Sequence, residues 1–135
     1  MGEVRISVKL VNAGDEILVR RGLLSAADVR VYETAALVDT GAVISAIPRQ
    51  ISQDLGLAPV RQERAQFANE SEEDVDVTEV VGIELEGRRT TEEMFILGNE
   101  VLIGQTVLER LDLLVDCRNG RLLPGHAQGL VLKIK

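Results

Sequence analysis

Apolar and polar residues alternate along much of the chain, and this pattern predicts a protein built mainly from β-strands. From Val4 to Leu10 every second residue is apolar, which indicates a strand with one buried face. Turn-forming residues follow at 12–15, and Ile17–Val19 is predicted to begin the returning strand. The continuous apolar run Ala35–Val38 fits a strand that is buried on both faces.

Three further strands are predicted between residues 75 and 103. Apolar residues of one parity run from Val75 to Leu85 and Gly87 follows, so this segment is expected to form one long strand. Shorter apolar runs predict strands at Met94–Leu97 and Val101–Ile103. Many short strands of this kind are typical of a closed or partly closed β architecture.

Two short helices and a hairpin complete the pattern. Apolar residues four apart around Pro48 predict a two-turn helix that ends at Gly56, and Thr106 is suited to cap a second helix. Asn119-Gly120 lies between apolar pairs and predicts a two-residue hairpin turn. Alternate apolar residues from Leu130 to Ile134 suggest a terminal strand.

The composition fits one folded domain that covers residues 1–135. Hydrophobic residues make up 45% of the 135 residues, and charged residues make up 27% and are spread along the chain, which argues against disorder. A chain of this length suits one domain better than two. Aromatic residues are only 2% of the chain, so aliphatic side chains must fill the core.

The formal net charge of −7 disfavours nucleic acid as a partner, because nucleic-acid-binding surfaces are basic. No apolar stretch approaches the roughly 20 residues that span a bilayer, no segment is basic and amphipathic, and the residues after Met1 do not form a secretory signal. The protein is therefore expected to have no membrane partner and to be cytoplasmic. The single cysteine, Cys117, excludes an intrachain disulfide.

One charged residue directly follows a stretch that should be buried. Asp39 comes after four apolar residues, a costly place for a carboxylate unless the protein uses it. The segment Ala36-Leu37-Val38-Asp39-Thr40-Gly41-Ala42 resembles the active-site loop of retropepsin-like aspartic peptidases. Val101–Gly104 and the helix after it resemble the segment that backs this loop in the family, and Leu113–Leu122 resembles the strand and hairpin that come next. The resemblance runs from Val29 to Leu123.

The resemblance implies a mainly-β, closed barrel of retropepsin type, with the active site at a homodimer interface. It also implies an aspartic endopeptidase, in which two carboxylates about 3 Å apart share one proton and act as base toward water and acid toward the peptide carbonyl. Only one Asp-Thr-Gly occurs in the chain, so each subunit would supply one Asp39 across a two-fold axis. The substrate would be a polypeptide bound in extended conformation.

The resemblance assigns supporting roles to the residues around Asp39. Thr40 would hydrogen-bond the opposite loop across the dimer axis, Gly41 would allow close approach of backbone or substrate, and Ala42 would line the pocket. Ile103-Gly104 would back the loop. No metal and no other cofactor are expected, because positioned water and electrostatic preorganisation supply the rate.

Family members also close a β-hairpin flap over the substrate. The best match is the segment Arg64–Val77, with its tip at Ala68-Asn69-Glu70-Ser71. The alternative is a plain solvated loop, because acidic residues cluster there.

Three departures from the family pattern concern the dimer and the flap. Val43 stands where retroviral members carry an acidic residue, and Gln105 stands where they carry an arginine. Those two family residues form an ion pair that supports the dimer, so another segment, such as the terminal strand at 130–134, must hold the copies together here. Retroviral flaps are glycine-rich, whereas no glycine lies between Gly56 and Gly82.

Other classes of function stay open. A non-catalytic dimeric peptide-binding module would keep the fold without turnover, and the glycine-free acidic flap favours it mildly. A structural β-barrel with an incidental Asp-Thr-Gly turn would be a monomer. A nucleophilic pair of Cys117 and His126 is disfavoured, because a small buried cysteine and an exposed loop histidine are expected instead.

Overall fold

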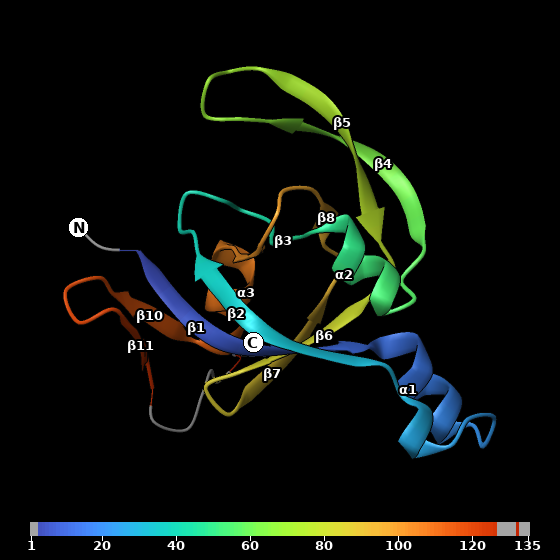
Figure 1. Ribbon diagram of the computed structural model, residues 1–135. Helices are drawn as coiled ribbons and strands as arrows, with labels where there is room; N and C mark the ends of the chain where they lie inside the picture. The colour runs from blue at the N-terminus through green and yellow to red at the C-terminus, as the bar shows by residue number, and fades with distance from the viewer. Residues whose placement is uncertain (1–2, 127–131, 133–135) are drawn as a thin grey trace.

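The structure of the protein is a computed structural model that describes residues 3–126 and residue 132. Within these residues the chain is mainly β-strand, with three α-helices and one 3₁₀-helix (Figure 1). The helices are α1 (Ala13–Arg20), η1 (Ala26–Asp28), α2 (Arg49–Asp54) and α3 (Gln105–Leu111). The strands are β1 (Val4–Asn12), β2 (Val31–Val38), β3 (Ala46–Ile47), β4 (Pro59–Gln66), β5 (Glu72–Thr78), β6 (Val81–Leu85), β7 (Arg88–Glu92), β8 (Phe95–Ile96), β9 (Val101–Ile103), β10 (Leu113–Asp116) and β11 (Arg121–Pro124).

Nine of the described strands form one sheet that curls around the core (Figure 1). Their order is β4-β5-β8-β3-β9-β2-β1-β6-β7, and β10 and β11 form a separate two-stranded sheet. The mainly-β fold predicted from the sequence is confirmed. With β4 and β7 at the two ends of the order, the sheet is a curled half-barrel, and closure of the barrel and the dimer interface stay predictions.

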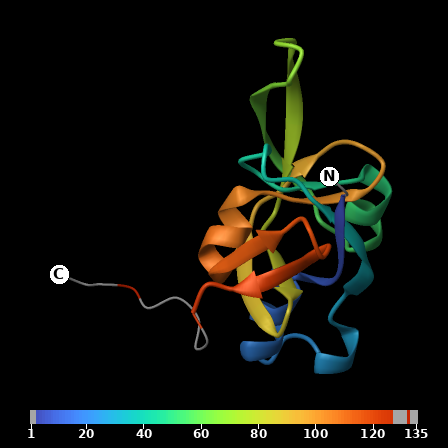
Figure 2. The ribbon, with the colours of Figure 1, turned by 90° about the vertical axis from the view of Figure 1, so that its left-hand side faces the viewer.

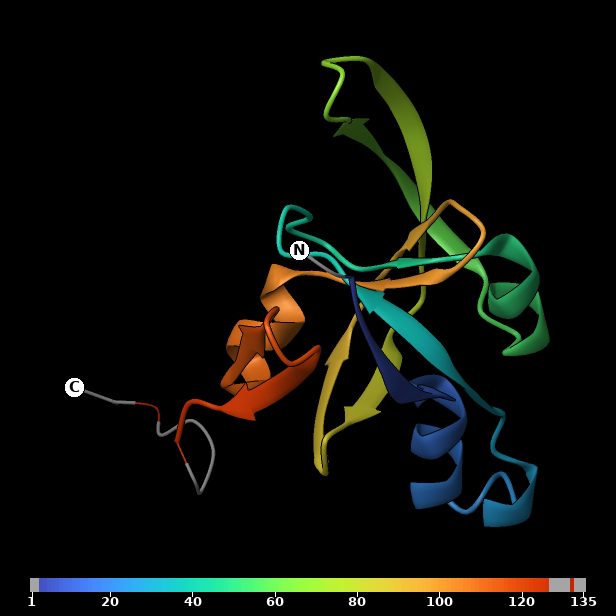
Figure 3. The same cartoon turned by 60° about the vertical axis from the view of Figure 1, so that its left-hand side comes forward.

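The hairpin and the first helices extend from opposite ends of the sheet body. The β4–β5 hairpin projects from one end, and α1 and η1 lie at the opposite end (Figures 2 and 3). Helix α3 lies beside the β10–β11 sheet at the flank of the body. No helix in the described residues is long and apolar enough to cross a membrane.

Strand β1 is the strand that the alternating pattern predicted. Its alternate apolar residues Val4, Ile6, Val8 and Leu10 are all buried, and they belong to an aliphatic core shared with β6, β9 and α3. β1 pairs with β2 from Val4 opposite Val38 to Val11 opposite Val31. The predicted strands that became β8 and β9 are confirmed as well.

Residues 13–20 form helix α1, so the returning strand predicted at Ile17–Val19 is wrong. The Asn12 side-chain oxygen caps this helix by accepting a hydrogen bond from the Asp15 N–H at 3.0 Å. Asp15 and Glu16 lie in the first turn, where acidic side chains interact favourably with the helix dipole. The polar residues after β1 therefore start an α-helix in addition to the two that were predicted. The strand that returns antiparallel to β1 is β2.

The Asp15 carboxylate ties α1 to the segment that leads into β2. It accepts hydrogen bonds from the Arg30 N–H, Nε–H and Nη2–H at 3.0, 2.9 and 2.8 Å. The Asp15 side chain is 5% exposed and that of Arg30 is 50% exposed. The side-chain hydrogen bond from Arg30 lowers the pKa of Asp15, against the opposing effect of burial.

We expect Asp15→Asn to lower the free energy of unfolding at neutral pH by about 1.5–3 kcal/mol, the scale of hydrogen bonds to charged groups. Because the pKa of Asp15 is lower in the folded state, its carboxylate stabilises the fold above the unfolded pKa of about 3.9. This contribution is lost as the pH falls through the folded-state pKa. Urea unfolding should show a stability difference at neutral pH that shrinks as the pH falls below the unfolded pKa. A difference that stayed the same in acid would contradict the linkage.

The long strand predicted over residues 75–85 is wrong, because the segment forms two strands, β5 and β6. β5 pairs with β4 and β8, whereas β6 pairs with β1 and β7. The chain turns at residues 79–80. At the last residue of β5, Thr78 Oγ1 accepts a hydrogen bond from the Met94 N–H at 3.0 Å. Apolar residues of the same parity are buried on both sides of the turn, so the alternation continues although the strand ends.

Both predicted helices are confirmed, with one change in detail. Helix α2 follows Pro48 and ends before Gly56, which has a left-handed φ of 67°. Helix α3 begins after Gly104, so Thr106 is not its cap. The Thr106 hydroxyl instead contacts the carbonyl oxygen of Val43.

The predicted C-terminal hairpin is present as β10 and β11. Asp116 pairs with Arg121, so the connection has the four residues 117–120 and the predicted two-residue turn is wrong. The Asp116 carboxylate accepts hydrogen bonds from the N–H and side-chain amide of Asn119, which close the longer loop. The terminal strand predicted at 130–134 lies outside the described residues, apart from residue 132.

Candidate active site

Two loops begin side by side at the same end of two neighbouring strands. β2 and β9 are parallel neighbours, and Val38 is in register with Ile103. Asp39 therefore begins its loop next to Gly104, and the Asp39 N–H donates to the Ile103 carbonyl at 2.9 Å. In this way the sheet brings together the loop and the backing segment that the sequence analysis singled out.

The Asp39 loop fixes its own carboxylate. Asp39 is half-buried, and its Oδ1 accepts a hydrogen bond from the Gly41 N–H at 3.0 Å. The Ala42 N–H donates to the Asp39 carbonyl at 3.1 Å. Thr40 is exposed. Among the described residues Oδ2 has no hydrogen-bond partner, so this oxygen is free to meet water or a second carboxylate.

Gly104 is the point at which the backing segment crosses behind the loop. It is buried, and a Cβ at this position would lie 2.9 Å from the Ala42 carbonyl oxygen and 2.9 Å from the Ile44 carbonyl carbon. These neighbours are backbone atoms that cannot rotate away, so glycine is required for the close approach. Directly after it, the Gln105 N–H donates to the Ala42 carbonyl at 2.8 Å.

Ser45 is a site residue that the sequence analysis missed. It is 1% exposed, and its Oγ accepts a hydrogen bond from the Gly104 N–H at 2.9 Å. Its carbonyl accepts one from the Phe95 N–H at 3.0 Å. The sequence contained one signal for this role, a hydroxyl residue between the apolar residues Ile44 and Ala46. A polar side chain in such a buried segment needs a hydrogen-bond partner.

The segment predicted as a flap forms the β4–β5 hairpin and not an irregular loop, and its role as a flap stays a prediction. The predicted tip, residues 68–71, lies in its turn, where the Phe67 N–H donates to the Ser71 carbonyl at 2.9 Å. Asn69 Oδ1 accepts from the Ser71 N–H at 3.0 Å. Glu70 has a φ of 68°, an uncommon conformation for a residue other than glycine. The turn thus closes without any glycine.

Arginines pair with most of the acidic side chains on the hairpin. Arg49, on α2, lowers the pKa of Asp76 through a side-chain hydrogen bond. Exposed pairs of this kind each contribute little to stability, but they offset the charge that clusters along the two arms. The ion pairs are Arg61–Glu63 at 3.0 Å, Arg64–Glu72 at 3.2 Å, Arg64–Asp74 at 3.1 Å and Arg49–Asp76 at 2.9 Å.

A groove of about 480 Å³ lies between the Asp39 loop and the hairpin, which arches over the loop in Figure 1. Its walls are mostly apolar, and Asp39 is the only acidic group among the described lining residues. Such a groove can hold an apolar chain segment against a carboxylate. The lining residues are Asp39, Gly41, Ala42, Val43, Ile44, Ala46, Arg64, Ala65, Gln66, Phe67, Ala68, Phe95, Leu97 and Leu102.

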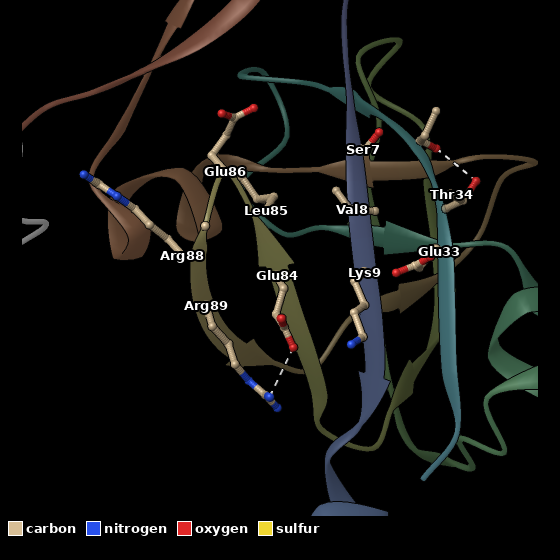
Figure 4. A pocket seen from close by; sticks show the side chains of 12 residues that line it. Ser7, Val8, Lys9, Glu33, Thr34, Glu84, Leu85, Glu86, Arg88 and Arg89 are labelled. Carbon is tan, nitrogen blue, oxygen red and sulfur yellow. Dashed lines mark hydrogen bonds and ion pairs between the residues drawn. The ribbon is translucent and has the colours of Figure 1, made fainter. Parts of the chain in front are cut away.

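A second hollow, of about 680 Å³, is lined by β1, β2, β6 and β7 (Figure 4). The strand register places Lys9 opposite both Glu33 and Glu84, and Glu84 accepts a hydrogen bond from Arg89 at 3.3 Å. Opposite charges thus alternate across four strands, an arrangement that stabilises sheets. The paired charges give this hollow a structural explanation. The Asp39 groove is the candidate active site because it holds the Asp-Thr-Gly carboxylate.

The other chemical groups considered from the sequence do not form a site. Cys117 is exposed, so the expectation that it is buried was wrong. His126 Nδ1 lies 2.7 Å from the Asp112 carboxylate, which is its observed partner. Among residues 3–126, no group of three or more His, Cys, Asp or Glu side chains is arranged to hold a metal ion.

Comparison with known proteins agrees with this geometry. Residues 27–110, more than half of the chain, match the family model described as "gag-polyprotein putative aspartyl protease". No curated protein sequence matches the chain. The crystal structure of the retroviral protease-like domain of Ddi1 from Leishmania major is similar in fold, with a TM-score of 0.55 and 14% identity over 90% of this chain and 83% of that chain. The chain therefore belongs to the retropepsin-like aspartyl protease family.

Proposed function

We propose that the protein is an aspartic endopeptidase that acts as a homodimer. The observation that carries this proposal is the Asp39 carboxylate, which lines an apolar groove. One of its oxygens is held by Gly41, and the other has no hydrogen-bond partner among the residues that the structure describes. A single carboxylate cannot serve as both base and acid. Because the chain has one Asp-Thr-Gly, the second carboxylate comes from Asp39 of a second copy.

In the proposed mechanism the two carboxylates share one proton. The ionised member takes a proton from a water molecule held between them while the water oxygen bonds to the scissile carbonyl carbon, and the protonated member donates its proton to the carbonyl oxygen. The C–N bond then breaks as the leaving nitrogen takes the proton that came from the water. One hydroxyl of the tetrahedral carbon returns its proton to the other carboxylate, so that a carboxylic acid and an amine leave and the pair again shares one proton. The Gly41 N–H keeps the carboxylate oriented throughout. No covalent intermediate forms, so the rate comes from the position of the water and the fixed dipoles of the loop.

The substrate in this proposal is a polypeptide in extended conformation beneath the β4–β5 hairpin. An extended chain presents side chains alternately to opposite sides, toward the loop floor and toward the hairpin. Ile44, Phe95 and Leu102 on the floor, and Phe67 on the hairpin, make these walls apolar. Apolar substrate residues are therefore expected next to the scissile bond.

The β10–β11 sheet is the segment we propose for dimer contact. Leu114 and Leu123 are directly paired across its two strands and are 59% and 36% exposed. A paired apolar surface on an outer two-stranded sheet (Figure 2) is typical of an interaction site when it remains in contact with water. It would act together with, or in place of, the terminal strand predicted at 130–134.

Leu114→Arg should convert the dimer to a monomer and abolish cleavage in parallel, because a buried unpaired charge is strongly unfavourable at an interface. Analytical ultracentrifugation and peptide cleavage over a range of protein concentrations measure both effects. Leu23→Arg is a matched control, since Leu23 is 72% exposed in the segment between α1 and η1. If the Leu114→Arg protein remained dimeric, β10–β11 would not be part of the dimer interface.

The test of the proposed function is cleavage of a mixed peptide library by the wild-type protein between acidic and neutral pH. We expect cuts between apolar residues, detected by mass spectrometry of the products. Absence of any cleavage by a verified dimer would overturn the peptidase proposal. In that case the alternative of a dimeric peptide-binding module, which the paired acidic hairpin without glycine favours, would be tested by peptide binding.

A further inference from the structure

The outer arm of the Asp39 loop, residues 42–44, is held from behind by the first residues of α3. The Gln105 N–H donates to the Ala42 carbonyl at 2.8 Å, and the Thr106 N–H donates to the Val43 carbonyl at 3.1 Å. The Val43 side chain is 67% exposed, so packing of this side chain does not fix the arm. Its position depends on backbone hydrogen bonds.

A carboxylate from another strand completes this support. Thr106 Oγ1 lies 3.1 Å from the Val43 carbonyl oxygen and 3.1 Å from Glu92 Oε2. The single hydroxyl proton is thus shared between the two acceptors. Glu92 is the last residue of β7, at the end of the sheet, and both Glu92 and Thr106 are half-buried. The Thr106–Glu92 hydrogen bond is therefore partly shielded from water, whereas the contact of the Thr106 hydroxyl with the Val43 carbonyl is exposed.

We propose that Glu92, acting through Thr106, is a positioning residue for the substrate-binding arm of the loop. This inference rests on the proposed function. Val43 and Gln105 are both uncharged, so an ion pair between these two positions cannot hold the arm. The link from Glu92 through Thr106 to Val43 supplies a brace within one subunit instead.

The brace acts on substrate binding more than on the chemical step. Val43 lines the groove, whereas the Asp39 carboxylate is held separately by Gly41 and the Asp39 backbone by Ile103. Loss of the brace therefore moves the groove floor and leaves the carboxylate oriented. A change in KM with little change in kcat is the signature of lost binding that is common to ground state and transition state.

The test compares variants that remove the brace with variants that keep it. Thr106→Val and Glu92→Leu remove the hydroxyl and the acceptor, whereas Thr106→Ser and Glu92→Gln retain them. We expect the first two to raise KM about five-fold, the value of one net hydrogen bond, with kcat changed less than about two-fold. The conservative pair should behave as wild type. The matched control is Glu33→Leu, which replaces an exposed strand glutamate (Figure 4). Any cost to sheet stability through Lys9 should leave KM and kcat unchanged.

A second readout does not depend on catalysis. The Thr106 N–H bonds the Val43 carbonyl, so its hydrogen–deuterium exchange should be about five-fold faster in Thr106→Val and Glu92→Leu and unchanged in the conservative pair. If the wild type cleaves nothing, the proposed function fails while this readout still tests the brace. Unchanged exchange, an unchanged KM in the disrupting variants, or an equal effect of Glu33→Leu would overturn the inference.

Discussion

Asp39→Asn should reduce peptide cleavage by at least about 10³-fold, within the range that general acid–base catalysis contributes, and should leave the fold and the dimer unchanged. Asparagine has nearly the same size and keeps an oxygen that can accept the Gly41 N–H. It cannot share a proton with a second carboxylate or deprotonate water. The loss should therefore appear in kcat, because the groove that binds the peptide is untouched.

The measurement is steady-state cleavage of a peptide selected by the wild-type protein, together with circular dichroism and ultracentrifugation of both proteins. Asp28→Asn is the matched control, since Asp28 is an exposed aspartate in η1. Cleavage by Asp39→Asn at the wild-type rate would show that Asp39 is not a catalytic residue. Loss of the dimer in Asp39→Asn would leave the catalytic role unproved and identify Asp39 as an interface residue.

Gly104→Ala should destabilise the protein by about 1–3 kcal/mol, the usual cost of forcing extra atoms into a packed site, and should also reduce cleavage. The added Cβ would lie 2.9 Å from backbone atoms of both Ala42 and Ile44. The loop must then move by several tenths of an ångström. Since a displacement of about 1 Å can reduce a rate about 10²-fold, we expect activity to fall at least about ten-fold even where the variant is fully folded.

Urea unfolding measures the loss of stability. Cleavage at urea concentrations where the variant is still fully folded measures the loss of activity. Gly22→Ala is the informative control, because a Cβ at Gly22 meets nothing within 4 Å but its φ of 73° is left-handed. It should lose about 1 kcal/mol from backbone strain and keep full activity. A Gly104→Ala protein with wild-type activity would show that the close crossing behind the loop does not position Asp39.

Much of the candidate site could be predicted because its determinants are local in the chain. Four apolar residues before Asp39 predict a strand that ends at a carboxylate, and the apolar run before Gly104 predicts a second strand. The expected burial on both faces is wrong for the first strand, where only Ala36 of the four residues is buried. Both predictions required only the pattern of neighbouring residues. The side-by-side position of these two segments came from the family resemblance, and the parallel register of Val38 with Ile103 agrees with it.

The errors have two sources: local capping residues that were interpreted as a turn, and contacts with distant parts of the chain. Ile17–Val19 suits a strand by composition, but the cap from Asn12 and the ion pair with Arg30 make the segment a helix. The single parity of residues 75–85 reports which side chains are buried. It carries no information about the turn at 79–80, because burial is preserved while the hydrogen-bonded partners change.

The sequence by itself determined the mainly-β class, the aliphatic core and the position of Asp39 at the end of a strand, because these follow from periodicity and from the cost of placing a carboxylate after apolar residues. Only the tertiary structure decided that Ser45, Thr106 and Glu92 support the loop. Their hydrogen bonds join residues that are far apart in the chain, and such contacts depend on how the sheet curls. No local pattern in the chain contains that information.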